Sequence, residues 1–133
     1  MEIIKSLPPN YEAIKQSGLK TNDDTVYCYG DKIYAPNCDP YPDVIYHESI
    51  HSKQQGDNPE VWWQRYLNDS GFRFEQELEA FAGQYDFVKK NTDARYAKQS
   101  LEEISEVLAS EQYKFGITRH EAASLIRHFG KKS

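Results

Sequence analysis

Two histidines four residues apart place the strongest constraint on how this chain can fold. Residues 47–51 read HESIH, an HExxH pattern. On a helix that turns about 100° per residue, His47 and His51 lie within roughly 40° of each other, so one metal ion can accept both imidazoles. Asp43 before the pattern is a plausible N-cap, and Gly56 after it is a plausible helix end. We therefore predict a metal-binding helix over residues 44–55.

The rest of the chain predicts an α+β fold with a helical majority. Residues 25–29 and 32–35 are rich in β-formers and are joined by Gly30-Asp31, which predicts a small β-hairpin. Capping signals and apolar spacing predict further helices over 11–16, from Pro59, over 71–90, over 93–113 and from the capping box at 118–121. A length of 133 residues suits a single domain, 1–133. The expected inward positions on the last two helices are Leu101, Ile104, Val107, Leu108, Ala122, Leu125, Ile126 and Phe129.

Charge and hydropathy exclude two classes of partner. The net charge is −5 and no stripe of Lys or Arg stands out, so no nucleic-acid partner is expected. No apolar run approaches the roughly 20 residues of a membrane span, and no apolar segment follows Met1–Ser6 as it would in a signal peptide. We expect a cytoplasmic protein (host cytoplasm if phage-encoded), with Lys131 and Lys132 in a solvated tail. The oligomeric state is left open.

A third protein ligand is needed if zinc is to keep one position for water. His120 and His128 lie far from the pattern in the sequence, so a carboxylate on the 71–90 helix is the better candidate. Glu77 is about 70° from the centre of the apolar stripe on that helix, Glu75 about 90° and Glu79 about 130°. The pattern therefore predicts His47, His51 and Glu77 as the ligands, with Glu75 and Glu79 in solvent.

Glu48 has a different position from the two histidines. It lies about 100° round the helix from His47, beside the metal without being obliged to bind it. A carboxylate in this place suits a base that takes a proton from water activated by the metal. We predict Glu48 as the catalytic residue. The pair Gln54-Gln55 after the pattern could cap the helix or bind backbone.

Three stretches of the chain together resemble a known family. HESIHSKQQ, WWQRYL and FRFEQELEAFAGQY are similar to the small gluzincin-like metallopeptidase domains called minigluzincins, common in phage and bacterial genomes. The resemblance spans about Val26 to Tyr85, and a weaker similarity continues from Tyr113 to Ile126. In that family a Glu-x-x-Ala sequence supplies the third zinc ligand, and Glu77-Leu78-Glu79-Ala80 matches it. Phe81 stands where related gluzincins often have Asp, which removes one possible partner of a metal ligand.

The resemblance implies a zinc-dependent peptidase with a zincin-like helical core. A small β element, here the 25–35 hairpin, would hold an extended peptide or protein substrate along its edge. Such an enzyme needs a donor for the oxyanion that forms during hydrolysis. The sequence offers four candidates and does not choose among them: Tyr66, Arg73, Tyr85 and His120.

Two other functions fit the same residues. Zinc can supply folding energy alone, so the chain could be a non-catalytic structural or peptide-binding module, such as a phage accessory protein. It could also be a regulator that binds a peptide by strand addition to the hairpin edge. Retention of Glu48 favours the enzyme, because a purely structural site needs no base. Trp62 and Trp63 could line a substrate cleft, but we expect at least one of them in the core.

Overall fold

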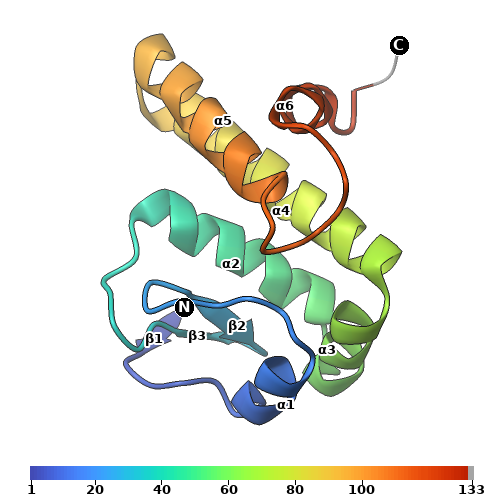
Figure 1. Ribbon diagram of the computed structural model, residues 1–133. Coiled ribbons are helices and arrows are strands. Elements are labelled where there is room, and N and C mark those ends of the chain that lie inside the picture. Colours follow the sequence, from blue (N-terminus) through green and yellow to red (C-terminus); the bar gives the residue numbers. More distant parts are fainter. Residues whose placement is uncertain (132–133) are drawn as a thin grey trace.

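Helix α2 (Pro42–Gln55), which carries the HExxH pattern, lies between a small sheet and a group of helices (Figure 1). The computed structural model describes residues 1–131, so Lys132 of the expected tail lies outside the described residues. The fold is α+β with a helical majority, as predicted. The other elements are β1 (Glu2–Ile4), α1 (Tyr11–Gln16), β2 (Tyr27–Tyr29), β3 (Lys32–Tyr34), α3 (Pro59–Asn68), α4 (Ser70–Asn91), α5 (Ala94–Leu108) and α6 (Arg119–His128).

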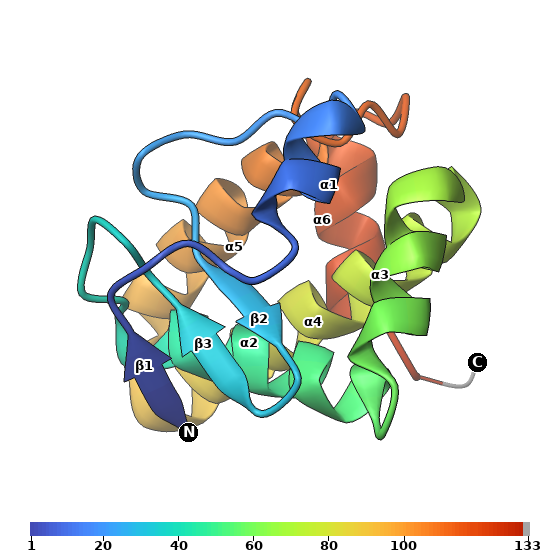
Figure 2. The same cartoon turned by 90° about the horizontal axis from the view of Figure 1, so that it is seen from below.

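The predicted hairpin forms and gains a strand that the sequence did not indicate. β2 and β3 pair antiparallel around Gly30, whose φ of 63° suits a two-residue turn. β1 adds to the far side of β3 in parallel, which gives the order β1-β3-β2. β1 and β2 are therefore the two edge strands, and Figure 2 shows α2 behind the sheet.

The ends of two helices differ from the prediction. α2 begins at Pro42 with Tyr41 as its N-cap, so Asp43 is not the cap but lies in the first turn. Proline is favoured at this first position because its fixed φ suits a helix and its missing N–H has no partner there. α5 ends at Leu108 and does not reach Tyr113. The chain after Leu108 turns through Lys114 and Gly116, which have φ values of 55° and 72°.

Three of the predicted inward residues on α5 and α6 are exposed. The exposed fraction is 40% for Val107, 39% for Leu125 and 42% for Phe129. These positions lie next to the buried stripe of each helix. The buried face of α5 and that of α6 are therefore narrower than we predicted. The inward residues that are confirmed are Leu101, Ile104, Leu108, Ala122 and Ile126.

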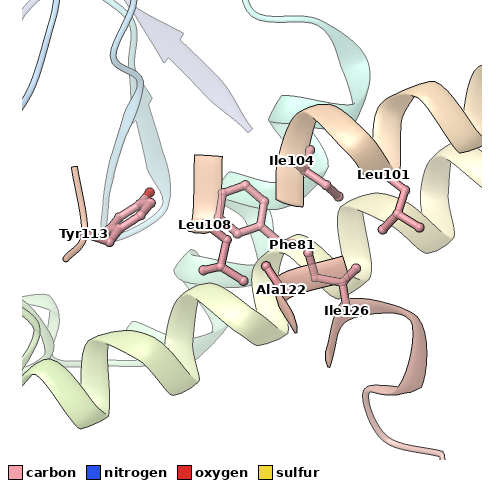
Figure 3. Packing of buried hydrophobic residues seen from close by; sticks show 7 residues of the cluster. All are labelled: Phe81, Leu101, Ile104, Leu108, Tyr113, Ala122 and Ile126. Carbon is pink, nitrogen blue, oxygen red and sulfur yellow. The ribbon is translucent and has the colours of Figure 1, made fainter. Parts of the chain in front are cut away.

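The buried apolar residues include two clusters, one of which contacts α2 through Phe81 on His47 and the other through Trp62 on His51. The helical cluster joins α4, α5 and α6 (Figure 3), and it comprises Phe81, Leu101, Ile104, Leu108, Tyr113, Ala122 and Ile126. The aromatic cluster joins α1, β2 and α3, and it comprises Ile14, Tyr27, Trp62, Trp63 and Tyr66. Both tryptophans are therefore in the core. Within residues 1–131, no helix combines the length and apolar character that a membrane crossing requires.

Candidate metal centre

The three predicted ligands come together at the contact between α2 and α4. Nε2 of His47 and Nε2 of His51 each lie 3.2 Å from Oε1 of Glu77. All three residues are buried, and their possible ligand atoms lie within 4.8 Å of one another. Gly83 on α4 permits this close approach, since an added Cβ would collide with Ile50 of α2. The group of His47, His51 and Glu77 could therefore hold a metal ion.

The separations and chemistry of these donors fit zinc. Around a tetrahedral zinc ion with bonds of about 2.0–2.1 Å, neighbouring ligand atoms lie about 3.3 Å apart. The two measured His–Glu separations of 3.2 Å are close to that value. Two imidazoles and one carboxylate also form a donor set that zinc uses where a position stays open for water. Calcium and magnesium prefer a set made of oxygen atoms.

Each imidazole contacts a glutamine amide through Nδ1, while its Nε2 faces Glu77. Nδ1 of His47 lies 2.9 Å from Oε1 of Gln84, and Nδ1 of His51 lies 2.7 Å from Oε1 of Gln54. Phe81 packs against the His47 ring with centroids 4.5 Å apart, and Trp62 against the His51 ring at 5.3 Å. The ring of Phe81 thus contacts His47, and Gln84 supplies the polar partner of this imidazole.

Among the three glutamates that we ranked on α4, Glu77 alone faces inward. Its exposed fraction is 3%, whereas Glu75 and Glu79 are exposed. The Tyr66 hydroxyl donates a hydrogen bond to Oε2 of Glu77, which leaves Oε1 directed at the two imidazoles. Sequence reasoning considered Tyr66 only as an oxyanion donor and missed this contact.

The electrostatics of the cluster favour a cation. Burial alone would raise the pKa of the Glu77 carboxyl, but the charge of His51 and hydrogen bonds from both imidazoles lower it below its ordinary value. Burial would lower the pKa of His51, but the charge and hydrogen bond of Glu77 raise it to about 9. A buried carboxylate between two nitrogen bases thus attracts positive charge, which a proton or a metal ion can supply.

Glu48 is buried beside the three ligands but stands outside their group. Its Oε2 lies 3.8 Å from Nε2 of His47, and its exposed fraction is 6%. Burial raises the pKa of the Glu48 carboxyl, and the charge of Glu77 adds to this effect, against the opposing influence of both imidazoles. A carboxylate with a raised pKa is suited to exchange protons near neutral pH.

A small cavity of about 70 Å³, partly open to solvent, adjoins the cluster. Its walls include His47, Glu48, His51 and Glu77, and it is also lined by Leu19, Thr21, Thr25, Gln112 and Tyr113. This volume holds a few water molecules and is too small for a peptide.

Tyr113 is the residue in this cavity that sequence reasoning missed. In Figure 3 it lies at one edge of the helical cluster, apart from Leu101 and Ile126. It lines the cavity together with Glu48 and Glu77. Burial raises the pKa of Tyr113 well above its ordinary value, and the charges of Glu77 and Glu48 add to this, so its hydroxyl stays protonated and can donate. Its sequence position, at the predicted end of a helix, gave no signal of this role.

The other donor candidates are placed elsewhere. Arg73 donates to the backbone oxygen of Tyr66 and does not line the cavity. Tyr85 has Lys89 over its ring and packs at the border of the helical cluster. His120 is exposed at the start of α6. The structure brings Tyr66 alone among the four to the metal cluster.

Gln55 binds backbone, one of the two roles considered for it, and it does so at the edge of β2. Its amide donates to the Cys28 oxygen at 2.8 Å and accepts from the Gly30 N–H at 2.7 Å, as a residue of an added strand would. Nε1 of Trp63 donates to the same Cys28 oxygen. This part of the sheet edge is therefore already filled by side chains, which limits strand addition to the residues before Cys28.

No protein-family model, curated protein or solved structure matches this chain.

Proposed function

We propose that this protein is a zinc-dependent peptidase related to the minigluzincins, in which His47, His51 and Glu77 bind zinc and Glu48 is the catalytic base. The supporting observation is that four buried side chains take two different positions. Three acceptor atoms converge from two helices at separations that suit zinc, while Glu48 stands beside them without joining. A cytoplasmic location and a peptide or protein substrate are part of the proposal.

Zinc at this position would supply a Lewis acid that activates water and polarises the scissile carbonyl. The residues of the chain then divide the proton transfers. Glu48 accepts a proton from the attacking water and returns it to the leaving amine. Tyr113 lines the same cavity from the loop that follows α5, and it donates a hydrogen bond to the oxyanion. Tyr66 is committed to Glu77 and holds that ligand in place.

Replacement of Tyr113 by phenylalanine tests the assignment of the donor. We expect Tyr113→Phe to lower kcat roughly 100-fold, because an oxyanion donor acts mainly in the transition state, with zinc affinity nearly unchanged. Steady-state rates and zinc titrations would be measured in parallel. Tyr96→Phe, at an exposed position on α5, is the matched control. An unchanged kcat in Tyr113→Phe would remove Tyr113 from the mechanism.

Entry of a peptide requires a change at the covering segments. The cavity is too small for a substrate, and residues 19–25 and 112–113 form part of its wall. We expect one of these segments to move aside before cleavage. Neither belongs to a helix or strand, so movement of either leaves the ligand helices α2 and α4 intact.

The primary test is the dependence of cleavage on zinc. We expect one zinc ion per chain, cleavage of a mixed peptide library by the zinc form, loss of cleavage after chelation and recovery when zinc is restored. Metal content would be measured by mass spectrometry and cleavage by peptide sequencing, with magnesium as the control ion. Equal cleavage by the metal-free protein would contradict the proposal.

The small volume of the cavity favours a second function, a zinc-stabilised module without hydrolytic activity. A metal ion that binds only the folded state stabilises it by about 2.7 kcal/mol at a concentration 100 times its dissociation constant. In that case zinc would raise the melting temperature while no peptide is cleaved. The library experiment separates the two functions, because both include zinc and only one includes cleavage.

A further inference from the structure

The hydrogen bonds behind the two imidazoles continue outward to further acceptors. Nε2 of Gln84 donates to Oδ2 of Asp43 at 2.8 Å. Nε2 of Gln54 donates to the backbone oxygen of Gln76 at 3.0 Å and to Oε1 of Glu79 at 2.7 Å. Each glutamine thus stands between a histidine and a carboxylate.

These outer acceptors settle which way each amide points. An ionised carboxylate and a backbone carbonyl can only accept hydrogen bonds. The amide NH₂ of Gln84 must therefore face Asp43, and the NH₂ of Gln54 must face Glu79. The amide oxygens are consequently left for the histidines, and an oxygen there requires each Nδ1 to carry the proton.

We infer that Gln84 and Gln54 are positioning residues that keep the proton on Nδ1 of His47 and His51, and that Asp43 and Glu79 hold the two amides in the orientation that does so. When a metal ion replaces the Nε2 protons that donate to Glu77, each neutral ring would offer the ion the lone pair of its Nε2. Oε1 of Glu77 lies 3.2 Å from each Nε2, and three acceptors so close together would need a cation between them. The inference rests on the proposed zinc site and adds the residues that preorganise it.

One experiment needs no substitution. In zinc-loaded protein labelled with ¹⁵N, long-range ¹H–¹⁵N correlation spectra report which ring nitrogen carries a proton and which binds the metal. We expect a protonated Nδ1 and a zinc-bound Nε2 in both His47 and His51. Zinc bound through Nδ1 of either ring would overturn the inference.

Variants test whether the amides matter for affinity. We expect Gln84→Leu and Gln54→Leu each to weaken zinc binding 10- to 100-fold, the range typical for partners of metal-ligating histidines. Gln99→Leu removes an exposed amide from α5 and should leave the affinity unchanged. Circular dichroism of each variant would precede the titrations, and Gln54 is only half-buried, so this variant is expected to fold even if Gln84→Leu does not.

Exchanging the amide of Gln84 and the carboxylate of Asp43 tests whether Gln84 orients His47 or only packs against it. Gln84→Glu alone sets two carboxylates against each other and should weaken zinc binding. Gln84→Glu combined with Asp43→Asn restores an acceptor for the His47 ring and a donor–acceptor pair between residues 84 and 43. We therefore expect the zinc affinity of the double variant to lie within about threefold of wild type, a much smaller loss than the 10- to 100-fold expected when a partner is removed. If wild type binds no zinc, the proposed function itself fails. If wild type binds zinc and the leucine variants bind it equally tightly, this inference alone fails.

Discussion

Glu77→Ala should weaken zinc binding by more than about 100-fold, beyond the range for residues that only support a ligand. The carboxylate is 3% exposed and its Oε1 is 3.2 Å from both imidazole Nε2 atoms, so its loss leaves two ligands where a zinc site of this kind needs three. Zinc titration against a chromophoric chelator would measure the effect. Zinc should also raise the melting temperature of wild type and not that of the variant.

Two neighbours on the same helix make this result specific. Glu75→Ala removes an exposed carboxylate two residues away and should bind zinc as wild type does. Glu79→Ala should have a smaller effect than Glu77→Ala, because Glu79 reaches the metal site only through Gln54. Glu77→Gln keeps the shape of the side chain and an acceptor for the Tyr66 hydroxyl. This second variant is therefore expected to fold even if Glu77→Ala does not. Zinc binding that survives in Glu77→Ala but is lost in Glu75→Ala would refute the ligand assignment.

Local periodicity was sufficient to predict that His47, His51 and Glu77 form a group that could hold a metal ion. The four-residue spacing of His47 and His51 fixes their common face once the segment is helical. The phase of the apolar stripe on α4 places Glu77 between Phe74 and Phe81, and therefore inward. These relations lie within single helices, where geometry is nearly independent of the rest of the fold. The contact between the two helices then had only to bring two predicted faces together.

The supporting residues depend on contacts between distant parts of the chain and were not predicted. Tyr113 was assigned to a helix that in fact ends at Leu108, so its position in the cavity depends on an irregular loop. The partner of Gln84 is Asp43, which lies 41 residues earlier and was taken for a helix cap. The one signal in the sequence was the helical spacing of Gln84 from Phe81 and Val88, which points it inward, where a polar side chain requires a partner.

The sheet shows the same limit. The hairpin of β2 and β3 was found from its own turn residues, whereas β1 pairs with β3 across about thirty intervening residues and carries no alternating pattern of its own. Phe81 was noted as the loss of a possible polar partner. The structure places its ring against His47, where it excludes water from one side of the imidazole.

Glu48→Gln should lower the rate of peptide hydrolysis by about 10²–10⁴-fold, the usual contribution of a general base. Glutamine has nearly the same shape as glutamate but cannot accept a proton at neutral pH. Glu48 does not belong to the three converging ligands, and its Oε2 lies 3.8 Å from the nearest imidazole nitrogen. Zinc affinity should therefore stay within a few-fold of wild type, since the change affects a neighbour of the ligands and not a ligand.

The measurement compares initial cleavage rates of zinc-loaded wild type and Glu48→Gln on the same peptide library. Ser49→Ala is the matched control, because Ser49 is on the same helix and its hydroxyl donates to the Tyr46 backbone oxygen away from the cluster. Equal rates in wild type and Glu48→Gln would show that Glu48 is not the base. No cleavage by either protein, with one zinc ion bound to each, would favour the structural module, and the buried carboxylate at position 48 would then need another explanation.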